Sequence, residues 1–339
     1  MAEAQRVVLA SRPVGEPTSE NFRLEQISVP APAAGEILLR TLWLSLDPYM
    51  RGRMSDAPSY AAPVAIDQVM EGSTVSEVVA TNNPDYKVGD IVLSRNGWQT
   101  HEVSSGKGLR KLDPKAAPLS YALGVLGMPG MTAYFGLAEI GKPQAGETLV
   151  VAAASGAVGS VVGQIAKIRG ARVVGVAGGD KKCRFVTEEL GFDACIDHRS
   201  PDFAAHLKEA CPKGIDVYFE NVGGKVFETV FPLLNNHARV PVCGVISQYN
   251  ASGPLQGSDW VPTLMRAILT KRLTVRGFLV GDFFPRYNEF ASEVVGWVKD
   301  GKLKYREDIV EGLENAPRGL IGLLRGENFG KRLVRVAQQ

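Results

Sequence analysis

A short turn between two apolar stretches is the first part of the sequence that could do chemistry. Residues 154–159 read ASGAVG, an A-x-G-x-x-G spacing with Ala154 in the place of the usual first glycine. The apolar run 148–153 is typical of a buried strand, and apolar residues follow over 158–168 at helical spacing. Unpaired amides at the start of such a helix favour an anion, and Gly156 lets the backbone approach a phosphate. The turn predicts a dinucleotide site; the alternatives are a turn without a ligand and another adenosine ligand, such as a methyl donor.

The residues after the second predicted strand indicate which dinucleotide binds. NAD sites carry a carboxylate about 20 residues beyond the turn, to hold the ribose hydroxyls. Here residues 178–182 read GGDKK, and two cations beside a glycine turn suit a 2′-phosphate. His198 and Arg199 could close the same pocket, so the sequence favours NADP(H). Two alternatives stay open, because Asp180 could hold the ribose of NAD and the lysines could be a solvated helix turn.

A metal site is not expected. Catalytic zinc needs three nitrogen or sulfur ligands and an open fourth position. Residues 1–125 contain no cysteine, and their single histidine, His101, is expected to be a surface or half-buried side chain. The four cysteines all lie in one half of the chain: Cys183, Cys195, Cys211 and Cys243. Their spacings match neither a disulfide framework nor a zinc cluster, which favours reduced thiols in the cytoplasm.

Composition excludes several classes of protein. With 339 residues the chain is expected to form two domains, and 45% hydrophobic residues suffice for packed cores. A net charge of +2 with 22% charged residues does not indicate a nucleic-acid-binding protein. The N-terminal MAEAQRVVLASRP has only a short apolar patch, which predicts neither a signal peptide nor a membrane span. These features favour a cytoplasmic protein with a small-molecule substrate.

The elements that must position these residues change character along the chain. Up to about residue 125 the pattern is β-rich, with strand-like runs over 36–46, 74–79 and 86–94. Strands and helices then alternate, which predicts an α/β fold with a doubly wound parallel sheet. The expected strands are 148–153, 172–177, 194–197, 215–220, 239–246 and 273–280, and helical patterns include 225–234 and 261–269. The tail ends in KRLVRV (331–336), which indicates one more strand.

Several long segments resemble a known family. They are LSLDPYMRGRM (44–54), GMPGMTAYFGL (127–137), AASGAVGSVVGQIAK (153–167), AGGDKKC (177–183), YFENVGG (218–224), CGVISQYN (243–250), RGFLV (276–280) and GENFGK (326–331). The chain resembles the zinc-free medium-chain dehydrogenase/reductase superfamily, and within it the NADPH-dependent alkenal, prostaglandin and curcumin double-bond reductases. The resemblance covers essentially the whole chain. It implies a GroES-like β-rich domain built from residues 1–125 and 305–339, a Rossmann NADP-binding domain over 126–304, and a homodimer.

The same resemblance assigns cofactor positions. The pyrophosphate would meet Gly156, Ala157, Val158 and Gly159, and Lys182 would meet the 2′-phosphate. His198 falls where relatives often carry a tyrosine. Met128 and Thr132 would lie beside the nicotinamide ring, and Asn328 would reach the cofactor from the tail. The nicotinamide half would be lined by Asn221, Cys243, Gly244, Ile246, Ser247, Tyr249, Phe278, Leu279 and Val280.

Without a metal, the reaction implied is reduction of the carbon–carbon double bond of an α,β-unsaturated ketone or aldehyde. Hydride goes to the β-carbon, and the resulting enolate needs a hydrogen-bond donor and a proton. Tyr249 is the leading donor, because it follows the carboxyl end of a predicted strand; the alternative is that it only packs against the cofactor. Tyr49 is a second candidate, or else a wall of an apolar substrate pocket with Arg51 and Tyr60. A ribose hydroxyl could also stabilise the enolate.

Three rival interpretations stay open. A quinone reductase of the same superfamily would use the same cofactor and differ only in its electron acceptor. An NADPH-binding module without catalysis would share the same fingerprint. A methyltransferase also begins with strand, glycine turn and helix, although the β-rich first domain and Lys182 disfavour it.

Overall fold

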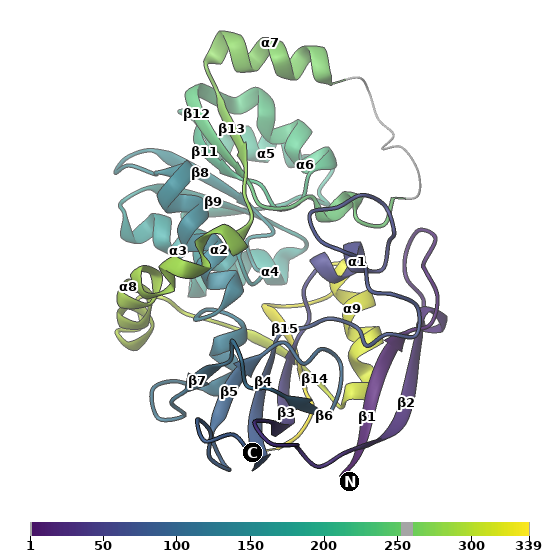
Figure 1. The fold of residues 1–339 in the computed structure, drawn as a ribbon. Helices are drawn as coiled ribbons and strands as arrows, with labels where there is room; N and C mark the ends of the chain where they lie inside the picture. The colour runs from purple at the N-terminus through teal and green to yellow at the C-terminus, as the bar shows by residue number, and fades with distance from the viewer. Residues whose placement is uncertain (1, 252–259, 339) are drawn as a thin grey trace. The chain divides into compact units, whose positions relative to one another are not determined.

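The computed structural model describes residues 2–251 and 260–338. The chain divides into two compact units, which are described separately (Figure 1). The β unit comprises residues 1–124 and 307–339, and the Rossmann unit comprises residues 125–306. One unit is built on a largely antiparallel sheet and the other on a parallel sheet, which confirms the predicted fold class. Within the described ranges, no helix is both long enough and apolar enough to cross a membrane.

The β unit joins the two ends of the chain in one sheet. Strands are ordered β14-β15-β3-β4-β5-β7, β6 also pairs with β3, and β1 and β2 form a separate antiparallel pair. The strands are β1 (Ala2–Leu9), β2 (Phe22–Val29), β3 (Ile37–Ser45), β4 (Thr74–Thr81), β5 (Ile91–Ser94), β6 (His101–Ser104), β7 (Arg110–Leu112), β14 (Glu307–Glu311) and β15 (Lys331–Arg335). The helices are α1 (Tyr49–Arg53) and α9 (Ala316–Leu324), with single turns η1 (Ser19–Asn21), η2 (Leu119–Leu123) and η8 (Leu313–Asn315). β15 runs antiparallel to β3, with Leu333 opposite Ser45.

The Rossmann unit contains a parallel sheet ordered β10-β9-β8-β11-β12-β13. Its strands are β8 (Thr148–Ala152), β9 (Arg172–Ala177), β10 (Ala194–Asp197), β11 (Ile215–Phe219), β12 (Leu234–Val242) and β13 (Thr274–Gly277). Its helices are α2 (Met128–Phe135), α3 (Gly159–Ile168), α4 (Asp180–Arg184), α5 (Phe203–Ala210), α6 (Gly224–Val230), α7 (Val261–Lys271) and α8 (Tyr287–Lys299). The 3-10 and π-helical segments are η3 (Gly136–Gly141), η4 (Phe185–Glu189), η5 (Phe231–Leu233), η6 (Ile246–Gln248) and η7 (Val280–Arg286). Because β9 and β11 flank β8 on opposite sides, the strand order reverses there, where such sheets bind ligands.

Burial explains why these strands read as continuous apolar runs. All five residues of β8 are buried, as are five of the six in β9, because helices cover both faces of the parallel sheet. Val150, Val174 and Tyr218 lie in one buried hydrophobic cluster of the unit. This buried sheet fixes the strand ends from which the candidate site extends.

Two predicted strands end earlier than expected. The run predicted over 239–246 leaves the sheet after Val242, because the amides of Cys243 and Gly244 bond the Glu220 carbonyl at 2.9 and 3.2 Å. The run predicted over 273–280 ends at Gly277, and Val280 already begins a 3-10 turn. Phe278, Leu279 and Val280 therefore lie outside β13, contrary to the predicted strand.

Candidate functional site

The glycine turn after β8 is closed around the carbonyl oxygen of Ala153. This residue has a left-handed backbone with φ of 53°, and its oxygen accepts the Gly156 amide at 2.9 Å. A Cβ atom on Gly159 would lie 2.3 Å from that oxygen, and one on Gly156 would lie 3.2 Å away. Since a real Cβ does not approach so closely, the first residue of α3 must be glycine. Ala157 and Val158 lie between these two glycines and are half-buried.

Basic side chains gather where β9 and β10 end. The His198 Nε2 and Arg199 Nε atoms would each lie 3.0 Å from a Cβ placed on Gly178, and the His198 amide bonds the Ala177 carbonyl at 3.1 Å. Burial lowers the pKa of His198, and the charges of Arg199 and Lys182 lower it further. Two basic side chains, His198 and Arg199, thus lie beside Gly178, where the 2′-phosphate was predicted to bind.

Two acidic residues lie close to these basic side chains. Asp180 is exposed at the start of α4, and the Asp197 carboxylate accepts the Arg199 amide at 2.9 Å. Burial of Asp197 raises the pKa of its carboxyl. The backbone amides that it accepts and the neighbouring His198 and Arg199 outweigh burial, so the pKa is lowered overall. Asp197 therefore stays ionised while holding the end of β10 beside β9.

Asn221 connects the ends of β11 and β8. Its Nδ2 donates to the Ala152 carbonyl at 2.8 Å. The preceding Glu220 is 2% exposed, and its Oε1 accepts the amides of Val222 and Gly223 at 2.6 and 2.8 Å. Burial raises the pKa of Glu220 in spite of these bonds. The turn thus depends on a buried carboxyl that the sequence analysis did not single out, although it directly precedes Asn221 in the FENVGG segment.

The loop after β12 is bonded to the same turn. The Ser247 amide and hydroxyl both donate to the Val222 carbonyl, at 3.0 and 2.5 Å, and the Ile246 amide donates to the Asn221 carbonyl at 3.2 Å. The Tyr249 hydroxyl accepts the Val245 amide at 3.4 Å. These bonds bring the predicted residues after β8, β11 and β12 together at one edge of the sheet.

Gly244 and Cys243 lie beneath this loop. A Cβ on Gly244 would lie 2.9 Å from the Tyr249 hydroxyl oxygen, so the ring lies close over the backbone. Burial, with a smaller contribution from Glu220, raises the pKa of Cys243 to about 12. The Cys243 thiol is therefore protonated at neutral pH.

The other predicted cofactor residues of the Rossmann unit contact their own neighbours. Thr132 is buried in α2, and its hydroxyl donates to the Met128 carbonyl at 2.7 Å. The Phe278 ring packs edge-on against Phe219 with centroids 6.2 Å apart, whereas Leu279 is exposed. Their contacts with a cofactor stay predictions.

In the β unit, the Arg53 guanidinium lies over the rings of both predicted tyrosines. Its guanidinium carbon lies 5.7 Å from the Tyr49 ring centroid and 4.5 Å from that of Tyr60, and its Nε lies 3.3 Å from a Glu71 oxygen. Tyr60 is 61% exposed, while burial, with help from Asp47 and Glu71, raises the pKa of the Tyr49 hydroxyl. Tyr49 is therefore a hydrogen-bond donor at neutral pH. Arg53 was not predicted as a site residue, because its position in the sequence does not show that it lies beside both tyrosines.

Two predicted residues of the β unit have their side chains bonded locally. Arg51 is 4% exposed, and its Nη2 donates to the Gly15 carbonyl at 2.7 Å. Asn328 Nδ2 donates to the Gly330 carbonyl at 2.8 Å. The roles predicted for Arg51 in substrate binding and for Asn328 in cofactor binding stay predictions.

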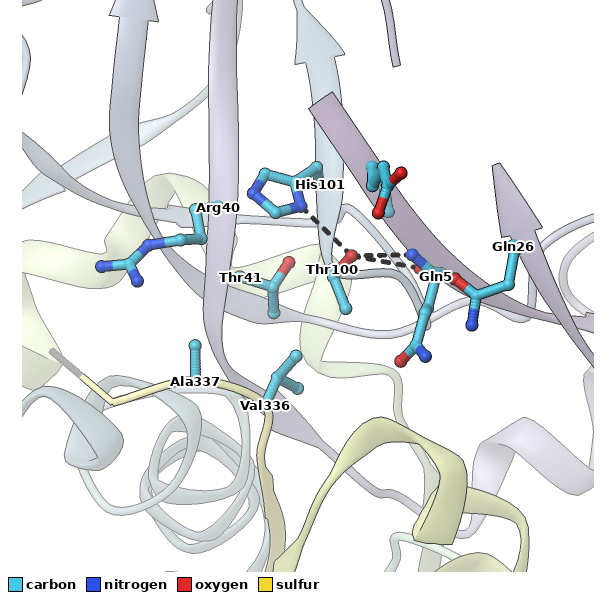
Figure 2. A pocket seen from close by; sticks show the side chains of 10 residues that line it. Gln5, Gln26, Arg40, Thr41, Thr100, His101, Val336 and Ala337 are labelled. Atoms are coloured by element: carbon cyan, nitrogen blue, oxygen red, sulfur yellow. Dashed lines mark hydrogen bonds between the residues drawn. The ribbon is translucent and has the colours of Figure 1, made fainter. Parts of the chain in front are cut away.

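A shallow recess of the β unit lies apart from all predicted site residues. Its volume is about 330 Å³, and Figure 2 shows His101, Thr100 and Gln5 along it. His101 Nδ1 lies 3.2 Å from the Thr100 hydroxyl, and burial, then Arg40, lowers its pKa. In the parts of the chain that the structure describes, no group of three or more His, Cys, Asp or Glu side chains is arranged to hold a metal ion.

Known proteins resemble this chain along nearly its whole length. Residues 5–112 match a family model described as the N-terminal domain of oxidoreductase, and residues 157–299 match one described as zinc-binding dehydrogenase. The NADPH-dependent curcumin reductase of Escherichia coli is 59% identical over 98% of this chain and 97% of its own length. The NADP(+)-dependent 2-alkenal reductase of Nicotiana tabacum is 38% identical over 99% and 98%. A crystal structure of CurA from Vibrio vulnificus in complex with NADPH has a TM-score of 0.96 and 56% identity, covering 99% of this chain and 100% of that one.

Proposed function

Because the chain belongs to the medium-chain dehydrogenase/reductase family, we propose that it reduces α,β-unsaturated ketones and aldehydes to their saturated counterparts. It is an NADP-dependent oxidoreductase acting on carbon–carbon double bonds, and its cofactor is NADPH. The observation that carries the proposal is similarity over the whole chain to reductases of curcumin and 2-alkenals.

The residues at the strand ends suit NADPH. The turn is tight, because a Cβ on Gly159 would collide with the Ala153 carbonyl oxygen. The amides at the start of α3 would meet the pyrophosphate, as at other helix N-termini of this kind. Lys182, His198 and Arg199 would hold the 2′-phosphate, for which charge-assisted hydrogen bonds are the strong contacts. Asn221 and the loop 243–249 would line the nicotinamide half, together with Met128, Thr132 and residues 278–280.

When bound, NADPH supplies a hydride for the β-carbon of the unsaturated carbonyl compound. The protein must then stabilise negative charge on the carbonyl oxygen and provide a proton for the α-carbon. Tyr249 is suited to donate, because its hydroxyl oxygen already accepts the Val245 amide and such chains strengthen donation by the hydroxyl. Tyr49 is the second donor in this proposal, with Arg51 and Tyr60 as substrate contacts, and a ribose hydroxyl is the third possible donor.

The reaction proposed for this enzyme uses no metal. A tyrosine hydroxyl can stabilise the negative charge on the enolate oxygen by donating a hydrogen bond, as a Lewis-acidic metal ion does in other enzymes. The free cysteines support a cytoplasmic location, since disulfides are rare there.

The test is the decay of NADPH absorbance with purified protein and a panel of acceptors. A straight-chain alkenal, a phenyl-substituted enone and a benzoquinone are compared, each with NADPH and with NADH. Fast NADPH consumption with the alkenal or the enone is expected. Turnover with the quinone alone would make the protein a quinone oxidoreductase, and tight NADPH binding without consumption would make it a binding module.

A homodimer is part of the proposal and rests on α7 and β13. Val261, Met265 and Leu269 recur every four residues on α7 and are 65%, 59% and 77% exposed, while Val275 on the neighbouring β13 is 38% exposed. β13 follows α7 in the chain and is the last strand of the described sheet (Figure 1), so two copies could pair along their β13 edges. Light scattering after size exclusion should give twice the chain mass, and Met265→Glu should shift it toward the monomer.

A further inference from the structure

Cys183 and Cys195 lie against each other without forming a bond. Their sulfur atoms are 2.9 Å apart, with the Cys195 thiol donating to Cys183, and both residues are only partly buried. This distance is about 0.9 Å longer than the sulfur–sulfur bond of a disulfide, which is about 2.0 Å. The two residues come from neighbouring elements, α4 and β10, so a small local movement would suffice to form that bond.

The surroundings of the pair favour Cys183 as the attacking sulfur. The hydrogen bond from Cys195 lowers the pKa of Cys183, against the opposing effects of burial and of Asp197 and Asp180. The same contact and burial raise the pKa of Cys195. Thiolates are the reactive form of cysteine, and a partly exposed sulfur beside a second cysteine is the arrangement found in redox-sensing thiols.

We propose that a hydroperoxide converts Cys183 and Cys195 into a reversible disulfide and that this bond weakens NADPH binding. The Cys183 thiolate attacks the hydroxyl oxygen of the peroxide, and the oxygen–oxygen bond breaks. The leaving oxygen takes up one proton, equal to the one lost when the Cys183 thiol ionised, and departs as water or an alcohol. The Cys183 sulfenic acid is then attacked by the Cys195 sulfur. The sulfur–sulfur bond forms, and the sulfenic hydroxyl leaves as water with the proton of the Cys195 thiol. Two thiols are oxidised and one peroxide is reduced.

The link to NADPH follows from where the pair lies. Cys183 directly follows Lys182. Cys195 lies on β10, three positions before His198, which follows the end of that strand. A bond between the sulfurs would draw α4 toward β10 and move the turn 178–182. That turn has little spare room, because a Cβ on Gly178 would already lie 3.0 Å from His198 and Arg199. This second half of the inference rests on the 2′-phosphate site proposed above, whereas the disulfide itself does not.

The chemical step is tested on the full-length protein with hydrogen peroxide and no cofactor. Intact mass should fall by two hydrogen atoms, peptide mapping should link Cys183 to Cys195, and dithiothreitol should reverse both changes. Cys211→Ala removes a buried thiol elsewhere and should leave the result unchanged. In Cys195→Ser the disulfide should be lost and a sulfenic acid at Cys183 should be trapped by dimedone. Retention of all four thiols in the wild type, or a different pairing, would overturn the proposal.

The effect on binding is measured by titrating NADPH against protein fluorescence. The dissociation constant should rise about tenfold on oxidation, equivalent to weakening one charge-assisted hydrogen bond. The variant lacking both Cys183 and Cys195 should show the same affinity before and after peroxide. Disulfide formation with unchanged affinity would overturn the link to NADPH. Failure of the reduced protein to bind NADPH would instead count against the proposed function and leave the mass result standing.

Discussion

Lys331 Nζ lies 2.7 Å from Asp47 Oδ1 in the interior of the β unit, and the two side chains are 1% and 7% exposed. Lys331 also donates to the Leu46 carbonyl at 2.8 Å, and the Ser45 hydroxyl donates to Asp47. The pair therefore joins the first residue of β15 to the end of β3, immediately before the helix that begins with Tyr49. Two residues 284 positions apart in the sequence thus hold the segment that carries a predicted catalytic tyrosine.

Breaking this buried pair should destabilise the protein strongly. Lys331→Met leaves the Asp47 carboxylate buried without its cation, for which we expect a loss of about 3–5 kcal/mol in the free energy of unfolding. The double variant Asp47→Asn with Lys331→Met removes both charges and should lose less than the single variant. Urea unfolding measures both, and a double variant less stable than Lys331→Met would contradict this account.

Gly159→Ala should damage the dinucleotide turn. The added Cβ would lie 2.3 Å from the backbone oxygen of Ala153, which cannot rotate away, so the turn must shift. We expect a loss of about 1–3 kcal/mol in stability together with weaker NADPH binding. Gly156→Ala is the matched comparison, since its Cβ would lie 3.2 Å from the same oxygen and should perturb thermal unfolding less.

Lys182→Ala should change the preference between the two nicotinamide cofactors. Loss of a charge-assisted hydrogen bond to the 2′-phosphate should raise KM for NADPH by about tenfold to a hundredfold and leave KM for NADH nearly unchanged. Lys181→Ala, at the exposed neighbouring position, is the control and should have little effect. Equal changes for both cofactors would place Lys182 outside the 2′-phosphate site.

Tyr249→Phe tests the proposed proton and hydrogen-bond donor. Removing a group that acts in the transition state should lower kcat about a hundredfold or more, with a small change in KM for NADPH. If Tyr249 only packs against the cofactor, both kcat and KM should stay nearly unchanged, because phenylalanine keeps the ring. Tyr49→Phe, measured in parallel, distinguishes the two tyrosines.

Glu220 should make stability depend on pH. Burial raises its pKa above the ordinary value of 4.5, so its contribution to stability is fully present below that value and is lost as pH rises through the raised pKa. Glu220→Gln keeps an oxygen for the amides of Val222 and Gly223 without the charge. Its melting temperature relative to wild type should therefore be higher at neutral pH than below pH 4.5. Glu228→Gln, exposed on α6, should show no such trend, and an unchanged difference across pH for Glu220→Gln would contradict this explanation.

Much of the fold could be predicted because the signals are local. The run 148–153 became β8 (Thr148–Ala152), and 172–177 and 194–197 coincide with β9 and β10. Apolar periodicity reports burial over a few residues, which suffices to identify a buried strand. The strand predicted over 239–246 was too long at its end, because the chain leaves the sheet after Val242. There the amides of Cys243 and Gly244 both bond the carbonyl of Glu220, at the end of another strand.

The sequence by itself determined the α/β alternation, the glycine turn with its basic neighbours, and the family. Only the tertiary structure decided which side chains meet. A Cβ on Gly163 would lie 1.8 Å from the ring of Phe192, a contact that no local pattern indicates. Asn221 reaches Ala152, and Cys183 reaches Cys195, only because β8, β9, β10 and β11 are neighbours in the sheet. Periodicity and motif spacing describe one stretch of chain at a time, whereas these contacts depend on the order of strands brought together by folding.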